Sequence, residues 1–296
     1  MNLNVLNYIN NLLWLGVPDI IKGLAISIVF VLIFKKAIKK YSFIFYIYPG
    51  LIFILYCTDG ILGLCNIELS DLMGDTLLWE LLWLPRSYSL DTSVGLGLIF
   101  IVMFIGVLPK WEFVRQLYII RKEMSVISGF ILIGHGVMRL PTMKNAFLNM
   151  NDFNIFLGFS YAILGVILLV LILIPWITSF RFARSKLSPE AWKRVQTYTS
   201  VPLIILICVF GITVNLGWGF SVLPTLGSSL REIKNTADGT AVSSLYQGYR
   251  VSTVFLSAKI YLALTVAYIW LRRKKLKEQS VGFKNDKSDL LKVGYR

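Results

Sequence analysis

Residues 155–180 read IFLGFSYAILGVILLVLILIPWITSF, an apolar run that contains no charged side chain. The run exceeds the roughly 20 residues with which an α-helix crosses the hydrocarbon core of a bilayer. The chain as a whole agrees with this, because 56% of its residues are hydrophobic and its mean hydropathy is +0.69. Such a composition excludes the soluble globular classes and predicts a protein that is built within a membrane.

Six further apolar stretches are separated from this one by polar loops. Lipid offers no partner to an unpaired backbone group, and the stretches lack the period-two alternation of barrel strands, so each one predicts a helix. The predicted fold is all-α, a polytopic membrane bundle of about seven transmembrane helices. The predicted spans are 12–34, 43–64, 94–108, 124–137, 155–180, 199–216 and 254–271.

Most of the 30 Lys and Arg residues gather at alternate ends of these spans, in segments 35–40, 110–122, 181–194 and 272–296. Cytoplasmic loops carry such an excess, so the N-terminus is expected outside and the C-terminus inside, in a multi-pass protein of the cell membrane. The net charge of +14 then reflects topology and attraction to anionic lipid in the bilayer. No aromatic and basic residues interleave on a soluble domain, so no nucleic-acid partner is predicted.

Motifs of soluble enzymes are missing from the sequence. It has no Gly-Lys-Ser or Gly-Lys-Thr phosphate loop, no zinc-ligand spacing and no dinucleotide-binding glycine fingerprint. No catalytic residue or metal site is therefore assigned. Polar side chains inside the spans become the functional candidates, because burying them in lipid is costly unless they are paired.

His135 is the only histidine and lies near the outer end of the fourth span. Its neighbours Gly134 and Gly136 leave room beside the ring, as a flat cofactor requires. The alternative is a hydrogen-bonded histidine that packs between helices.

Asp59 and Lys259 lie toward the outer ends of spans two and seven. They are candidates for an intramembrane polar pair across the bundle, or for holding a charged ligand. In the alternative explanation, Lys259 extends its ammonium to the interface and Asp59 lies in the headgroup layer.

Two segments carry a resemblance to a known family. Residues 114–125, VRQLYIIRKEMS, resemble a basic entry into a histidine-bearing helix, here followed by His135; residues 175–180 and 191–196, PWITSF and AWKRVQ, resemble an inner loop and the start of the next such helix. This pattern is similar to the ferric reductase-like transmembrane family of cytochrome b type. That family includes membrane parts of ferric reductases and NADPH oxidases, and the haem subunit of a periplasmic methionine sulfoxide reductase system.

The apolar runs, the basic residues and the resemblance, which covers roughly residues 94–211, together divide the chain into four parts. Residues 1–93 would hold two N-terminal transmembrane helices and an outer amphipathic loop, and residues 94–219 would form the family's four-helix core. Residues 220–271 would hold an outer loop and the last helix, and residues 272–296 a basic cytoplasmic tail.

The resemblance also implies haem b held between histidines on two helices, the second one near Gln196 or around Cys208 and Val209. Neither place has a histidine, so one copy of the chain cannot supply two imidazoles. His135 would then be a single axial ligand, with water, Cys208 or a partner subunit opposite. The alternative is that the cofactor has been lost.

The tail after residue 271 is too short for a nicotinamide or flavin domain, so any electron donor would be a quinone-type molecule or a separate protein. The leading expectation is a membrane oxidoreductase subunit that transfers electrons across the membrane. The alternative is a non-redox carrier or assembly subunit that has lost haem, and a third option is a structural partner of another membrane protein.

Overall fold

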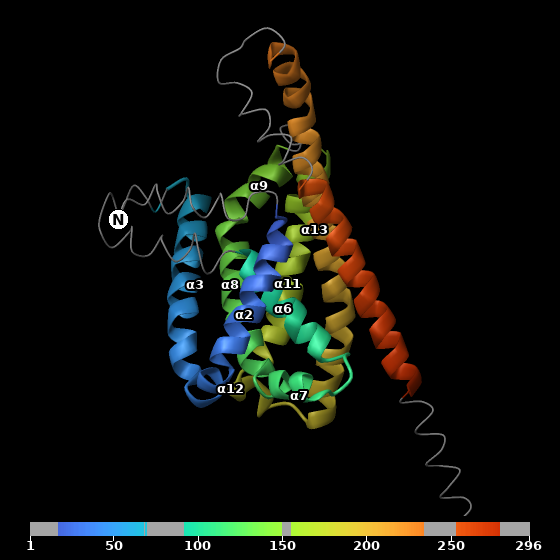
Figure 1. Ribbon diagram of the computed structural model, residues 1–296. Coiled ribbons are helices and arrows are strands. Elements are labelled where there is room, and N and C mark those ends of the chain that lie inside the picture. Colours follow the sequence, from blue (N-terminus) through green and yellow to red (C-terminus); the bar gives the residue numbers. More distant parts are fainter. Residues whose placement is uncertain (1–16, 68, 70–91, 150–154, 234–252, 279–296) are drawn as a thin grey trace, which may run out of the picture.

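The structure is a computed structural model that describes residues 17–67, 69, 92–149, 155–233 and 253–278 (Figure 1). Every regular element in these ranges is helical, which confirms the predicted all-α class. Most of the predicted outer amphipathic loop, much of the loop before the last span and most of the basic tail lie outside the described residues.

The helices follow one another along the chain as a bundle with short connections. Their bounds are α2 (Asp19–Lys40), α3 (Ser42–Leu64), α6 (Thr92–Ile105), α7 (Glu112–Ile119), α8 (Arg121–Met138), α9 (Leu140–Leu148), α10 (Ile155–Phe159), the π-helical turn η2 (Ser160–Leu164), α11 (Gly165–Ile177), α12 (Arg181–Arg184) and α13 (Pro189–Ile233). A final helix, Thr253–Glu278, completes the described chain.

Each of the seven predicted spans coincides with a helix, but the helices differ in their ability to cross a bilayer. Four are long and apolar enough: α3, the continuous run α10–η2–α11, the first part of α13 and the final helix. The pair α8 and α9, bent by 42°, gives a fifth. Helix α6 is shorter, and α2 carries charges at both ends. The described part of the chain thus contains four to five candidate spans, and the count of seven stays a prediction.

Two interruptions of regular helix shape the end of the bundle that holds α9. The bend between α8 and α9 precedes Pro141, whose ring disfavours helical backbone in the residue before it. The π-turn η2 widens the helix around Ser160, whose hydroxyl donates to Thr213 Oγ1 on α13 at 2.6 Å. Such π-turns often occur at functional sites, and this one carries Tyr161.

Small residues let the central helices approach closely. Ser27 on α2 donates its hydroxyl to the Val94 carbonyl at 3.0 Å, and Ser128 on α8 donates to the Gly95 carbonyl at 2.8 Å. Between α3 and α8, a β-carbon on Gly60 would lie 2.8 Å from the Met138 Cα. In membranes such close backbone packing replaces much of the hydrophobic driving force between helices.

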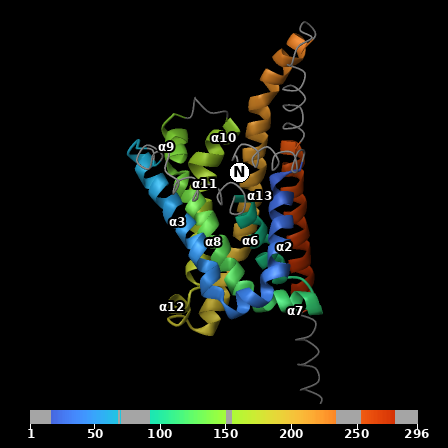
Figure 2. The same ribbon diagram turned by 60° about the vertical axis from the view of Figure 1, so that its left-hand side comes forward.

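The described parts of the four groups of basic residues predicted to share one side do meet at one end of the bundle. Figures 1 and 2 show α7, α12, the turn between α2 and α3 and the end of the final helix at this end. Arg121 Nε donates to the Val102 carbonyl at 3.1 Å, and Lys275 Nζ donates to the Gly106 carbonyl at 2.6 Å. These cations satisfy carbonyls at the C-terminal end of α6, where a helix favours positive charge.

Candidate functional site

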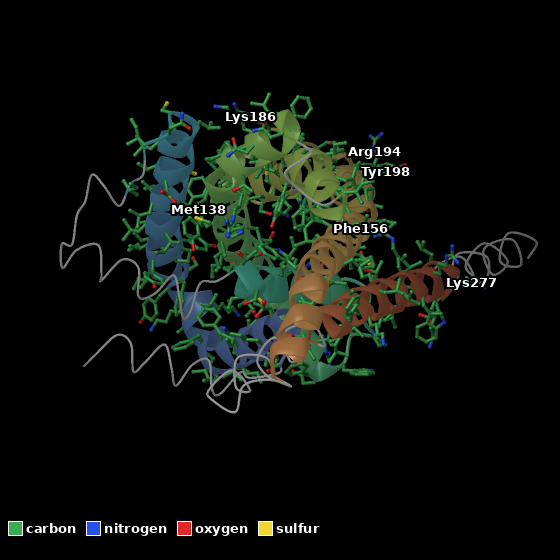
Figure 3. The ribbon with its side chains drawn as sticks, turned by 90° about the horizontal axis from the view of Figure 1, so that it is seen from above. Met138, Phe156, Lys186, Arg194, Tyr198 and Lys277 are labelled. Atoms are coloured by element: carbon green, nitrogen blue, oxygen red, sulfur yellow. The ribbon has the colours of Figure 1, made fainter. Side chains whose placement is uncertain are left out.

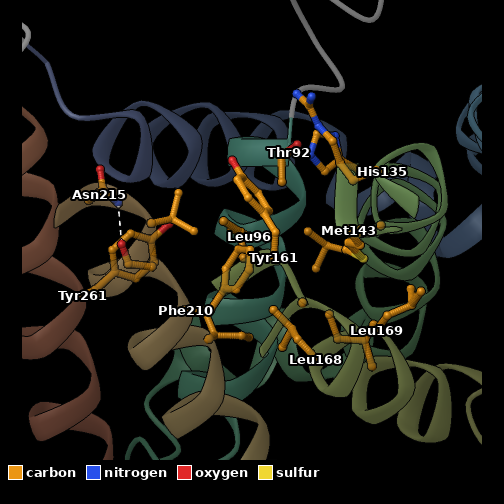
Figure 4. Close-up of a pocket in the computed structure, with 18 residues that line it drawn as sticks. Thr92, Leu96, His135, Met143, Tyr161, Leu168, Leu169, Phe210, Asn215 and Tyr261 are labelled. Carbon is orange, nitrogen blue, oxygen red and sulfur yellow. Dashed lines mark hydrogen bonds between the residues drawn. The ribbon is translucent and has the colours of Figure 1, made fainter. Parts of the chain in front are cut away.

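A cavity of about 240 Å³ opens among the helices at the opposite end from the basic residues (Figure 4). Its walls come from α6, α8, α9, η2, α11, α13 and the final helix, so it depends on nearly the whole bundle. The lining residues are Thr92, Leu96, Leu132, His135, Gly136, Arg139, Met143, Tyr161, Gly165, Leu168, Leu169, Ile172, Ile207, Phe210, Gly211, Val214, Asn215 and Tyr261.

The cavity has a polar end and an apolar end. Figure 4 shows Thr92, His135 and the hydroxyl of Tyr161 gathered at one end, with Leu168 and Phe210 at the other. A concave, mainly apolar site with a few converging polar groups is the usual form of a small-molecule site. The arrangement suits an amphipathic guest.

His135 projects from the last turn of α8 and is half-buried. Its ring meets the Tyr56 ring edge-on, with centroids 6.3 Å apart and planes at 79°. The flanking glycines serve helix packing: a β-carbon on Gly134 would lie 3.2 Å from the Phe53 Cα, and one on Gly136 would lie 2.8 Å from Leu169 Cδ1. Of the two glycines only Gly136 borders the cavity, whereas Gly134 packs against α3. The space that was expected on both sides of the His135 ring therefore exists only on the side of Gly136.

The wall that faces His135 across the cavity belongs to α13 and carries no second haem ligand. Phe210 and Val214 are apolar, and the Asn215 amide is engaged, since its Nδ2 donates to the Gly211 carbonyl at 2.6 Å. None of these groups is a usual axial ligand of haem iron. The described residues therefore do not fit a haem held between two histidines.

Neither of the other predicted ligands lies beside His135. Cys208 is 4% exposed and packs in the apolar core, outside the residues that line the cavity. Gln196 lies twelve residues earlier on α13, about 18 Å along the helix. Its Nε2 donates to Thr178 Oγ1 at 3.0 Å, and it borders a separate small cavity at the basic end.

Thr92 and Tyr161 belong to the site but could not be found from the sequence. The Thr92 hydroxyl oxygen is buried and has no hydrogen-bond partner among the described residues. An unsatisfied buried hydroxyl costs about 1–3 kcal/mol, so a polar group of a guest or a water would stabilise it. In the sequence Thr92 is an ordinary residue at the start of a span, and the π-turn that directs Tyr161 leaves no clear motif.

The predicted polar pair is not formed within the chain. Arg115 pairs with Glu112, whereas no ion pair joins Asp59 to Lys259 within the described part of the chain. Asp59 lies on α3, which packs against α8, whereas Lys259 lies on the final helix, whose Tyr261 ring meets that of Phe100 on α6. Figure 3 shows the two helices on opposite sides of the bundle. The intervening α6 and α8 thus separate the two charges.

A family comparison agrees with the resemblance seen in the sequence. Residues 92–207 match the family model described as ferric reductase like transmembrane component. No curated protein matches the chain, and no solved structure does. The matched segment contains His135 but ends before Phe210, Gly211, Val214, Asn215 and Tyr261, so part of the cavity wall lies beyond it. Helices α6 to α12 and the first part of α13 are thus similar to a ferric reductase-like transmembrane component, and the long apolar helices support an integral membrane protein.

Proposed function

We propose that the chain is a ligand-binding membrane subunit, in which the cavity beside His135 takes a small amphipathic molecule where relatives would hold haem between two histidines. The observation that carries this proposal is the cavity itself. It is lined by seven helical elements, it has an unsatisfied Thr92 hydroxyl at its polar end, and it offers one imidazole only.

The lining indicates the chemistry of the guest. His135, Arg139 and Tyr161 all carry N–H or O–H donors, so the polar end favours a group that accepts hydrogen bonds, such as a carbonyl. Leu168 and Phe210 favour an aliphatic or aromatic remainder. A volume of about 240 Å³ lies just below the roughly 300–1,000 Å³ of drug-sized sites, so the guest is small or inserts only one end.

Filling the cavity should remove the guest. Leu96→Trp places an indole in the apolar part of the cavity, whereas Ile163→Trp adds the same side chain at a position that is 41% exposed on η2. We expect solvent extraction and mass spectrometry of the purified wild type to find one compound retained in proportion to protein. It should be depleted roughly tenfold in Leu96→Trp and kept in Ile163→Trp, because a loss of about 1.4 kcal/mol in binding is tenfold in affinity. Equal retention in all three proteins would contradict the proposal.

A second candidate is an electron-transfer subunit, in which His135 supplies one axial ligand to a haem and a quinone or separate protein supplies electrons. The observation that favours it is the family match, which includes the His135 helix α8. The two candidates differ in whether the purified chain carries haem. The absorption spectrum of the detergent-purified chain separates them.

We also propose that the basic end of the bundle faces the cytoplasm and that seven helices cross the cell membrane, because basic residues are retained on that side. Cys65 is exposed at the opposite end of α3 and provides a native probe. In intact cells, a membrane-impermeant maleimide should label Cys65 and should not label a Lys186→Cys variant that lacks Cys65. Labelling of position 186 without labelling of Cys65 would show that the basic end faces outward, and would contradict the proposed orientation.

A further inference from the structure

Helices α3 and the final helix form two outer edges of the bundle. They lie on opposite sides in all three views of the chain (Figures 1 to 3). Of the four long apolar helices they are also the two least covered by the rest of the molecule. Each therefore offers a side face that a neighbouring protein or lipid must cover.

Both faces are apolar stripes with helical spacing. On α3 the stripe holds Ile44, Ile47, Leu51, Ile54 and Ile61, all of them exposed. On the final helix it holds Leu256, Leu262, Val266 and Trp270, which are 45–61% exposed. Residues three or four positions apart share one side of a helix, so each stripe can pack along a second helix.

Each of these helices carries one charge near its stripe. Lys259 is exposed between Leu256 and Leu262, and Asp59 is half-buried, between the stripe of α3 and the buried residues Tyr56 and Gly60. Neither forms an ion pair or hydrogen bond with a described residue. A lone charge within the hydrocarbon costs about 2.5–3.5 kcal/mol at the centre of a span, which favours a partner of opposite charge.

The two charges lie in the same layer of the bundle. Asp59 precedes Gly60, which packs against Val137, the residue after Gly136 on α8. Lys259 lies two residues before Tyr261 on the final helix. Gly136 and Tyr261 border the same cavity, so both charged residues lie within the range of depth that this cavity spans, on opposite outer faces.

We propose that two copies of this chain associate side by side in the membrane, with α3 of one copy against the final helix of the next and Asp59 paired with Lys259 between them. The charges complement each other, and the two stripes supply apolar contact at matching depth. Because the two faces differ, the contact is head-to-tail, and repeated contacts close into a ring when the rotation between copies permits.

Charge exchange tests this contact in the full chain. Two pools of protein, with Cys57 and Cys208 replaced by serine, are labelled at Cys65 with donor or acceptor dye and reconstituted in phosphatidylcholine vesicles. We expect energy transfer above the level of random proximity for the wild type. Asp59→Lys and Lys259→Asp should each weaken association roughly tenfold, the scale of an interhelical polar contact, and the double exchange should restore it.

Arg273→Asp is the matched control, since it makes the same charge change on the same helix beyond the apolar stretch, and it should leave energy transfer unchanged. If a reversed variant fails to fold, Asp59→Asn and Lys259→Gln replace it, and each should still weaken association. The proposal would be overturned if energy transfer in the wild type stayed at the level of random proximity, or if the single variants kept the full wild-type transfer. It would also be overturned if the double exchange did not restore energy transfer.

Discussion

Gly60→Val is expected to destabilise the bundle strongly. A β-carbon at this position would meet the backbone of Val137 and Met138 on α8, which cannot rotate away as a side chain can. Overpacking of a well-packed contact costs about 1–3 kcal/mol and more where backbone must move. Val137 and Met138 lie within one helical turn of His135 on α8. The same change should therefore also distort the cavity.

Gly50→Val on the same helix is the matched control, because a β-carbon there meets nothing within 4 Å. Both variants carry the same change in helix propensity, so the difference between their unfolding midpoints measures the contact of residue 60 with α8. We expect thermal unfolding in detergent to show a clearly lower midpoint for Gly60→Val than for Gly50→Val. Equal midpoints would show that α3 and α8 do not approach as closely as described.

The fold could be predicted to a large extent because hydrophobic runs in lipid permit few alternatives. The run 155–180 predicted one helix, and the structure has helix from Ile155 to Ile177, yet with a π-turn at its centre. The turn depends on Ser160 reaching Thr213 on another helix. A single sequence shows apolar length but does not show which helices lie side by side, and the separation of Asp59 from Lys259 follows from that order.

The candidate site was predicted less completely. His135 could be found because it is the only imidazole, and the structure places it on the cavity. The position expected opposite it was Cys208, whereas α13 lines the cavity with its neighbour Ile207 and with Phe210, Gly211, Val214 and Asn215. The residues of α8 and α13 that reach the same level depend on helix packing, for example of Gly211 against the Tyr261 ring, and this cannot be read from the spacing of ligands.

We expect that a single chain cannot hold haem through two histidines. His135, the only histidine of the chain, lines the cavity, so no pair of imidazoles can bind one iron within a chain. Full occupancy through two axial histidines is excluded for a single copy. Any haem that does bind through one ligand should be lost in His135→Ala, while Gln196→Ala, at the basic end of the bundle, should leave it unchanged.

The absorption spectrum of the detergent-purified chain, together with its haem content by pyridine haemochrome assay, tests the central claim most directly. We predict less than one haem per chain and no low-spin spectrum of the kind given by two imidazole ligands. One haem per chain with a low-spin spectrum of paired imidazoles would contradict the account, because a second histidine ligand would then have to come from outside the chain.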